Sequence, residues 1–132
     1  MNRLLIALFF IFPLASFSQI QINEIFADNG DCCLDDYSEE EDFLEIINLG
    51  DFPIDLAGYF FGDQDGGSII PFGFPEQTTI SSGQVLALWF DDDVDQGPLH
   101  VGAKLDNDGE IILVIDADGD TIVNETYGPQ SE

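Results

Sequence analysis

Basic side chains are nearly absent from this chain. Its 132 residues include only Arg3 and Lys104 as basic residues, against 27 aspartates and glutamates, so the formal net charge is −25. Binding of nucleic acid requires lysine and arginine to neutralise phosphates, and this composition therefore excludes direct nucleic-acid binding from the expected functions. The negative charge favours cations and basic partners instead.

Histidine and cysteine are scarce as well. The single histidine, His100, has no Gly-x-Ser-x-Gly motif elsewhere in the chain to supply a serine nucleophile, and we interpret it as a hydrogen-bonded structural residue. The two cysteines, Cys32 and Cys33, are adjacent and lack the further cysteine that a zinc site would need. They could bond to each other with strained geometry, stay reduced, or form a disulfide-linked dimer through Cys32 or Cys33.

A long apolar run occurs only at the N-terminus. Residues 4–14 are almost entirely apolar, follow a short basic start and precede the small-residue stretch 15–18. This layout predicts a signal peptide over 1–18 and a mature domain over 19–132, because the run is too short to span a bilayer. We therefore expect a secreted protein (extracellular, cell surface or periplasm) with no membrane span in the mature chain.

Alternating apolar and polar residues predict an all-β fold. No stretch beyond residue 18 keeps a helical period, and 45% hydrophobic residues with 12 phenylalanines are enough for a packed core, to which we assign Trp89. About seven to nine short strands separated by turn residues indicate a β-sandwich or barrel. The expected strands are 20–25, 43–47, 54–61, 85–90, 99–105, 110–115 and 121–127, and residues 28–42 are expected to form an exposed acidic loop.

The order of these segments resembles the lamin tail domain. The similar stretches are 22–25, 42–51, 54–63, 74–83 and 99–110, and within them the motif positions are Asn23, Glu24, Glu45, Asn48, Gly58, Asp63, Lys104 and Gly109. Phe43 stands where the family usually has tryptophan, and a further family strand after residue 130 is missing, so the chain could be truncated at its C-terminus. The resemblance implies an immunoglobulin-like β-sandwich that binds or tethers, as in the secreted bacterial members of the family.

Two acidic turns are candidate metal sites. Asp91, Asp93 and Asp95 alternate in one turn, and Asp116, Asp118 and Asp120 alternate in another that also contains Gly119. Ca²⁺ needs six to eight oxygen ligands, which such alternation can direct at one centre. The competing interpretation is ordinary turn chemistry, because Asp-Gly is a default hairpin turn. We expect no required cofactor, with Ca²⁺ as the ion these turns could hold.

Three functions follow from these patterns. The first is a non-catalytic binding or tethering module for a protein or polysaccharide at the cell surface. The alternative is a Ca²⁺-dependent module that binds polysaccharide or another polyanion. The third is an enzyme or an enzyme accessory that uses Glu24 and Glu45 as paired carboxylates, although hydrogen bonding at a sheet end explains the same residues. The sequence favours the first and predicts that the protein is not an enzyme.

Overall fold

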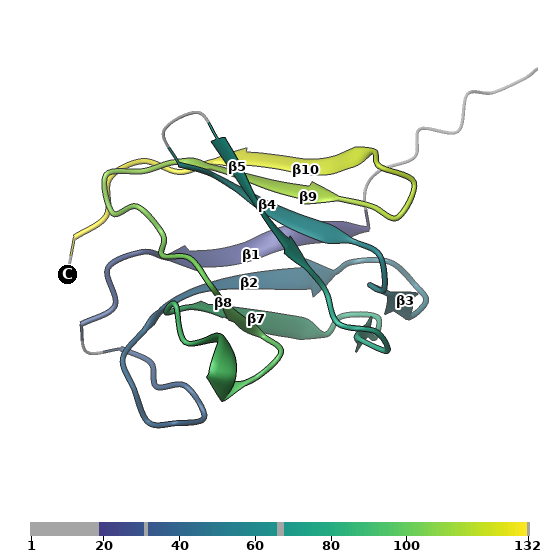
Figure 1. The fold of residues 1–132 in the computed structure, drawn as a ribbon. Coiled ribbons are helices and arrows are strands. Elements are labelled where there is room, and N and C mark those ends of the chain that lie inside the picture. Colours follow the sequence, from purple (N-terminus) through teal and green to yellow (C-terminus); the bar gives the residue numbers. More distant parts are fainter. Residues whose placement is uncertain (1–18, 31, 66–67, 132) are drawn as a thin grey trace, which may run out of the picture.

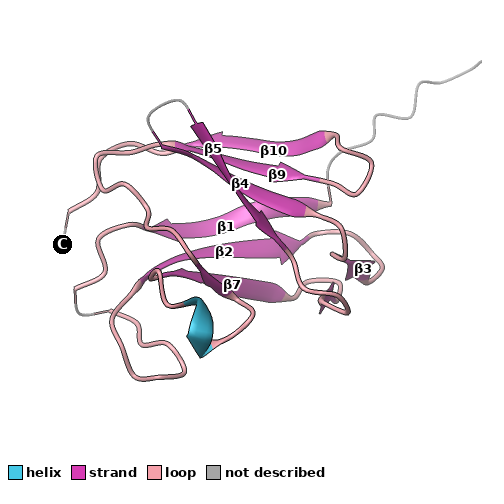
Figure 2. Ribbon diagram, in the orientation of Figure 1, coloured by secondary structure: helices cyan, strands magenta, loops and turns pink. Residues whose placement is uncertain are grey.

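Two four-stranded sheets face each other as a sandwich (Figure 1). The computed structural model describes residues 19–30, 32–65 and 68–131. In this part of the chain the one helical element is a short 3₁₀ turn, η1 (Val94–Gln96), and the remaining regular structure is β-strand (Figure 2). The predicted all-β, immunoglobulin-like sandwich is therefore confirmed. Residues 1–18, predicted as a signal peptide, lie outside the described residues.

Neighbouring strands within each sheet are antiparallel, except at one edge of the first sheet, where β7 and β8 run parallel. A third, very small sheet pairs β3 with β6. The strand order of the first sheet is β1 (Ile20–Phe26), β2 (Asp42–Asn48), β7 (Val85–Phe90), β8 (His100–Val101). The strand order of the second sheet is β10 (Thr121–Thr126), β9 (Ile111–Ile115), β4 (Phe60–Asp65), β5 (Ser68–Gly73). The small sheet consists of β3 (Ile54–Asp55) and β6 (Thr79–Ile80).

The core lies between the sheets because alternate residues of each strand point inward. In β2, Leu44 and Ile46 are fully buried, and in β9 the same alternation buries Ile112 and Val114. Phe61 of β4 and Phe90 of β7 meet across the interface, with ring centroids 5.4 Å apart. These contacts join the two sheets into one apolar core.

Trp89 lies on the other face of the first sheet, and its assignment to the core was wrong. Phe26, Phe43 and Trp89 form a cross-strand row, in which Phe43 stacks on Phe26 at 5.6 Å and contacts Trp89 at 5.5 Å. Phe43 is buried but is not part of the inter-sheet core. Aromatic residues one position along a strand from core residues must face away from them, which explains this second apolar row.

Several segments differ from their predicted structure. The strand expected over residues 99–105 covers only β8, His100–Val101. Residues 54–61 were expected to form one strand, but a turn at Gly58, whose φ is +78°, separates β3 from β4. Residues 68–73, which include Pro71, were not among the predicted strands. The structure places them in β5 at the edge of the second sheet, where a residue without an N–H is tolerated.

Cys32 and Cys33 are bonded to each other. In this state neither sulfur is available to link two chains, so the disulfide-linked dimer is not the arrangement found. Within the described residues, no helix is long and apolar enough to cross a membrane.

Candidate functional site at the acidic end of the sandwich

Three connecting segments gather at one end of the sandwich. Residues 27–41 leave β1 and lead into β2, residues 91–99 leave β7, and residues 102–110 lead toward β9. Figure 1 shows all three at the same end, with η1 and the loop before β2 on its lower side. This end carries the densest run of aspartates and glutamates in the chain.

Asp35 is buried at the centre of a tight turn. Its side chain is only 7% exposed, and its Oδ1 atom accepts hydrogen bonds from the backbone N–H groups of Tyr37, at 2.8 Å, and Glu39, at 2.9 Å. The Oδ2 atom is buried and has no hydrogen-bond partner in the described part of the chain. An unpaired buried acceptor costs roughly 1–3 kcal/mol, and more when it is charged, so this atom marks an incompletely satisfied site.

Asp91 and His100 form a second buried pair directly opposite. Asp91 directly follows β7 and is 5% exposed, while His100 begins β8 and is 6% exposed. The Oδ2 atom of Asp91 contacts Nδ1 of His100, and its Oδ1 atom accepts a hydrogen bond from the N–H of Asp93 at 2.8 Å. The carboxylate is therefore fixed in orientation by the turn that follows it.

The loop before β2 is fastened to the segment after β7. The Tyr37 hydroxyl donates to the backbone carbonyl of Gln96 at 2.8 Å, and the Gln96 side-chain amide donates to Glu39 at 2.6 Å. The Tyr37 ring also packs edge-on against the His100 ring, with centroids 5.8 Å apart. These contacts bring Asp35 to the Asp91–His100 pair.

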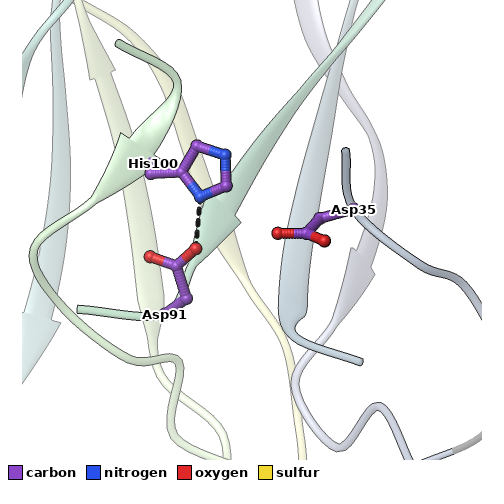
Figure 3. Close-up of side chains that lie close together, drawn as sticks. All are labelled: Asp35, Asp91 and His100. Atoms are coloured by element: carbon purple, nitrogen blue, oxygen red, sulfur yellow. Dashed lines mark hydrogen bonds and ion pairs between the residues drawn. The ribbon is translucent and has the colours of Figure 1, made fainter. Parts of the chain in front are cut away.

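The result is a cluster of two carboxylates and one imidazole (Figure 3). One ligand atom from each of Asp35, Asp91 and His100 lies within 4.8 Å of the others, and all three residues are buried. A histidine held by a carboxylate also occurs in hydrolytic triads, but the third member here is a carboxylate and not a hydroxyl or thiol nucleophile. The donor set suits a metal ion better than covalent catalysis.

An acidic cavity lies at the same end of the sandwich, lined by residues outside this cluster. It has a volume of about 450 Å³ and is lined by Ala27, Asp28, Asn29, Asp42, Lys104, Leu105, Asp106, Asn107 and Glu110. Burial raises the pKa of Asp42, although a hydrogen bond from the Asn29 N–H and the charge of Lys104 oppose the shift. Burial also raises the pKa of Glu41, against the opposing charge of Lys104.

Glu110 is a further acidic residue that lines the cavity. Its Oε1 atom accepts hydrogen bonds from the Tyr127 hydroxyl, at 2.7 Å, and the Asp106 N–H, at 3.1 Å, while Oε2 is buried without a partner among the described residues.

The structure divides the two predicted metal sets. Asp91 belongs to the buried cluster, whereas Asp93 and Asp95 are exposed. Asp116, Asp118 and Asp120 lie in the β9–β10 turn at the opposite end of the sandwich (Figure 1), where Asp116 Oδ1 accepts hydrogen bonds from the N–H groups of Asp118 and Asp120. Asp116 therefore shapes the hairpin turn, and Ca²⁺ binding by these residues stays a prediction.

Glu24 and Glu45 are direct neighbours across β1 and β2. They lie on the outward face of the first sheet, opposite to the face that carries Leu44 and Ile46. Glu45 accepts a hydrogen bond of 2.7 Å from the side-chain amide of Asn23. Glu45 is therefore hydrogen-bonded, but by a side-chain amide on the exposed sheet face rather than by backbone or hydroxyl groups at a sheet end, and a role of the pair in catalysis stays a hypothesis.

The other motif residues have structural surroundings. Asn48 is fully buried and donates to the carbonyls of Phe52, at 2.8 Å, and Ile80, at 3.0 Å. Gly58 and Gly109 have positive φ, Asp63 lies within β4, and Lys104 is exposed at the rim of the acidic cavity.

Sequence reasoning correctly interpreted His100 as a hydrogen-bonded residue, but it missed Asp35 and the grouping of Asp35 with Asp91 and His100. The loop over residues 28–42 was expected to be exposed; half of its described residues are exposed and others are half-buried, and Asp35 is buried. No local spacing marks Asp35, because its partners come from the far end of β7 and from β8. The one available signal was that the only histidine of the chain follows an aspartate run.

Comparison with known families identifies the fold. The Lamin Tail Domain model matches residues 13–129, which is most of the chain and includes all of the strands described above. No curated protein matches the sequence. The match agrees with the resemblance seen in the strand and turn motifs, and the chain belongs to the lamin tail domain family.

Proposed function

We propose that this protein is a secreted, non-catalytic binding and tethering module, and that its acidic loop end contacts a protein partner at the cell surface. Membership of an immunoglobulin-like family supports an interaction role. The large excess of acidic over basic residues favours a partner with a basic surface.

The observation that carries the proposal is the set of apolar side chains exposed at the acidic end. Leu34, Tyr37 and Val94 are 57%, 54% and 59% exposed, and they lie on the two segments joined by the Tyr37 and Gln96 hydrogen bonds. Exposed aromatic and aliphatic side chains next to charged ones are the usual composition of a binding surface. The two segments hold these side chains on a fixed support.

The opposite end of the sandwich supplies a matched control. Leu49 and Phe52, which follow β2, are also exposed apolar residues, at 56% and 74%. The test passes cell-surface proteins over three immobilised proteins: the wild type, the double variant Leu34→Ser/Val94→Ser and the double variant Leu49→Ser/Phe52→Ser. We expect one basic protein to be retained by the wild type and the second variant, to be lost on the first, and to elute with salt. Equal retention by all three proteins, or no retention, would contradict the proposal.

Calcium-dependent binding of a polysaccharide or another polyanion is the second candidate, and the concentration of Asp116, Asp118 and Asp120 in one turn favours it. If this candidate is right, millimolar Ca²⁺ raises the Tm of the protein, and EDTA releases the bound ligand. An unchanged Tm would remove this candidate.

A further inference from the structure

We propose that Asp35, Asp91 and His100 form a binding site for a divalent transition-metal ion of the Zn²⁺ class. The site would hold the loop before β2 against the segment after β7. The proposal stands on this cluster alone and does not depend on which partner the domain binds.

The ligand types select this class of ion. Imidazole nitrogen together with carboxylate oxygen suits Zn²⁺ and its neighbours, which accept three protein ligands and keep a fourth position for water. Ca²⁺ requires six to eight oxygens, and the two carboxylates and one nitrogen of this cluster do not provide them.

Burial gives an independent reason for a cation. The Oδ2 atom of Asp35 is buried without a partner, and Figure 3 shows the Asp35 carboxylate directed toward the Asp91–His100 pair. Two buried carboxylates share this space with a single imidazole. A divalent ion would neutralise both carboxylates and supply the missing partner of Asp35.

The ligands are already oriented by their own hydrogen bonds. Backbone N–H groups of Tyr37 and Glu39 hold the other oxygen of Asp35, and the N–H of Asp93 holds the other oxygen of Asp91. Such outer contacts are typical of metal ligands in proteins. Two atoms bonded to one tetrahedral Zn²⁺ ion lie about 3.4 Å apart. The ligand atoms now lie within 4.8 Å of one another, so the Asp35 turn must move inward, and the direct Asp91–His100 contact must open to admit the ion.

The first test compares metals and variants by thermal unfolding and titration calorimetry, on untagged chain under non-reducing conditions. We expect Zn²⁺ to raise Tm more than an equal concentration of Ca²⁺ does. Asp35→Asn, which keeps the two hydrogen bonds to Oδ1, should weaken Zn²⁺ binding at least about tenfold. Asp36→Asn changes the net charge equally at an exposed neighbour and should bind as the wild type does. Equal effects of the two metals, or equal affinities of the two variants, would overturn the proposal.

The second test needs no variant, so it remains decisive if Asp35→Asn fails to fold. His100 is the only histidine, and its ring nitrogens therefore give the only imidazole signals in a ¹⁵N NMR spectrum of the untagged chain. We expect stoichiometric Zn²⁺ to shift one ring-nitrogen signal to the position of a metal-bound nitrogen. Binding of Zn²⁺ that leaves both signals in place would show that the ion sits on surface carboxylates, and would refute the site.

Discussion

At the scale of single residues, buried polar side chains organise the regions where strands end. Asn48 closes the end of β2, because its amide reaches the carbonyls of Phe52 and Ile80 while its Oδ1 atom accepts the Gly50 N–H at 2.8 Å. Asp35 and Asp91 do the same for turns at the other end of the molecule. Side-chain hydrogen bonds replace strand pairing where the chain turns.

Replacing Asn48 by alanine should destabilise the fold strongly. The change leaves the buried Ile80 carbonyl, the partly buried Phe52 carbonyl and the partly buried Gly50 N–H without these partners, and we expect a loss of about 2–4 kcal/mol in the free energy of unfolding. Urea denaturation measures it. Asn124→Ala, on the exposed side of β10, is the control and should change stability by less than about 0.5 kcal/mol. Similar losses for both variants would show that the Asn48 hydrogen bonds contribute little.

Asp42→Asn should stabilise the protein at neutral pH. Burial raises the pKa of Asp42, so its charged form is disfavoured in the folded state, and asparagine can still accept the Asn29 N–H. The gain should be under about 1 kcal/mol because the group is partly solvated. It should disappear as the pH falls through the pKa of folded Asp42, where the wild-type carboxyl becomes neutral.

Unfolding curves of both proteins between neutral and acidic pH measure this difference. Asp51→Asn, in an exposed turn, is the charge-matched control. A gain for Asp42→Asn that persists at the acid end would contradict the assignment to burial of the charge.

At the scale of elements, the strands were largely predictable and their junctions were not. Alternating or continuous apolar runs bounded by turn residues located β1, β2, β7, β9 and β10. The break between β3 and β4 depends on the positive φ of Gly58, which the apolar pattern does not reveal. The candidate site was the least predictable part, since Asp35 reaches Asp91 and His100 only after the sheet has assembled.

Gly109 and Gly119 allow a matched test of two turns. Both have left-handed φ, +99° and +89°, but a Cβ on Gly109 would lie 2.5 Å from the Tyr127 carbonyl oxygen, whereas one on Gly119 would meet nothing within 4 Å. Gly119→Ala should therefore cost only the backbone strain, about 1–2 kcal/mol. Gly109→Ala should cost about 1–3 kcal/mol more, because the segment that follows β10 at Tyr127 and Gly128 must also shift. Chemical denaturation of both variants measures the difference, and equal losses would show that this contact relaxes freely.

At the scale of the whole molecule, charge repulsion opposes the apolar core. The negative charges lie mainly on turns and loops, and the acidic end adds partly buried carboxylates to them. Dissolved ions screen such repulsion over about 10 Å at 0.1 M salt. Stability should therefore depend on ionic strength more than it does in a protein of balanced charge.

We expect Tm to rise steadily as sodium chloride is added from low to moderate concentration. Screening weakens repulsion in the folded state more than in the expanded unfolded chain. Differential scanning calorimetry measures the slope, and a variant with exposed Asp92, Asp95, Asp106 and Asp108 changed to asparagine should show a smaller one. A Tm that is independent of salt in both proteins would contradict this account.

The arrangement of the first and last strands has a mechanical consequence. β1 and β10 contact each other and run in the same direction, as their arrowheads in Figure 1 show. Gln130, just beyond β10, fastens to the end of β1 through the Ala27 N–H, at 2.7 Å, and the Ile25 carbonyl, at 3.0 Å. A force applied between residues 19 and 131 therefore acts along β1 and β10. The hydrogen bonds between β1 and β2 must then break together in shear. We expect the domain to unfold at a higher force than a domain whose strand hydrogen bonds break one after another.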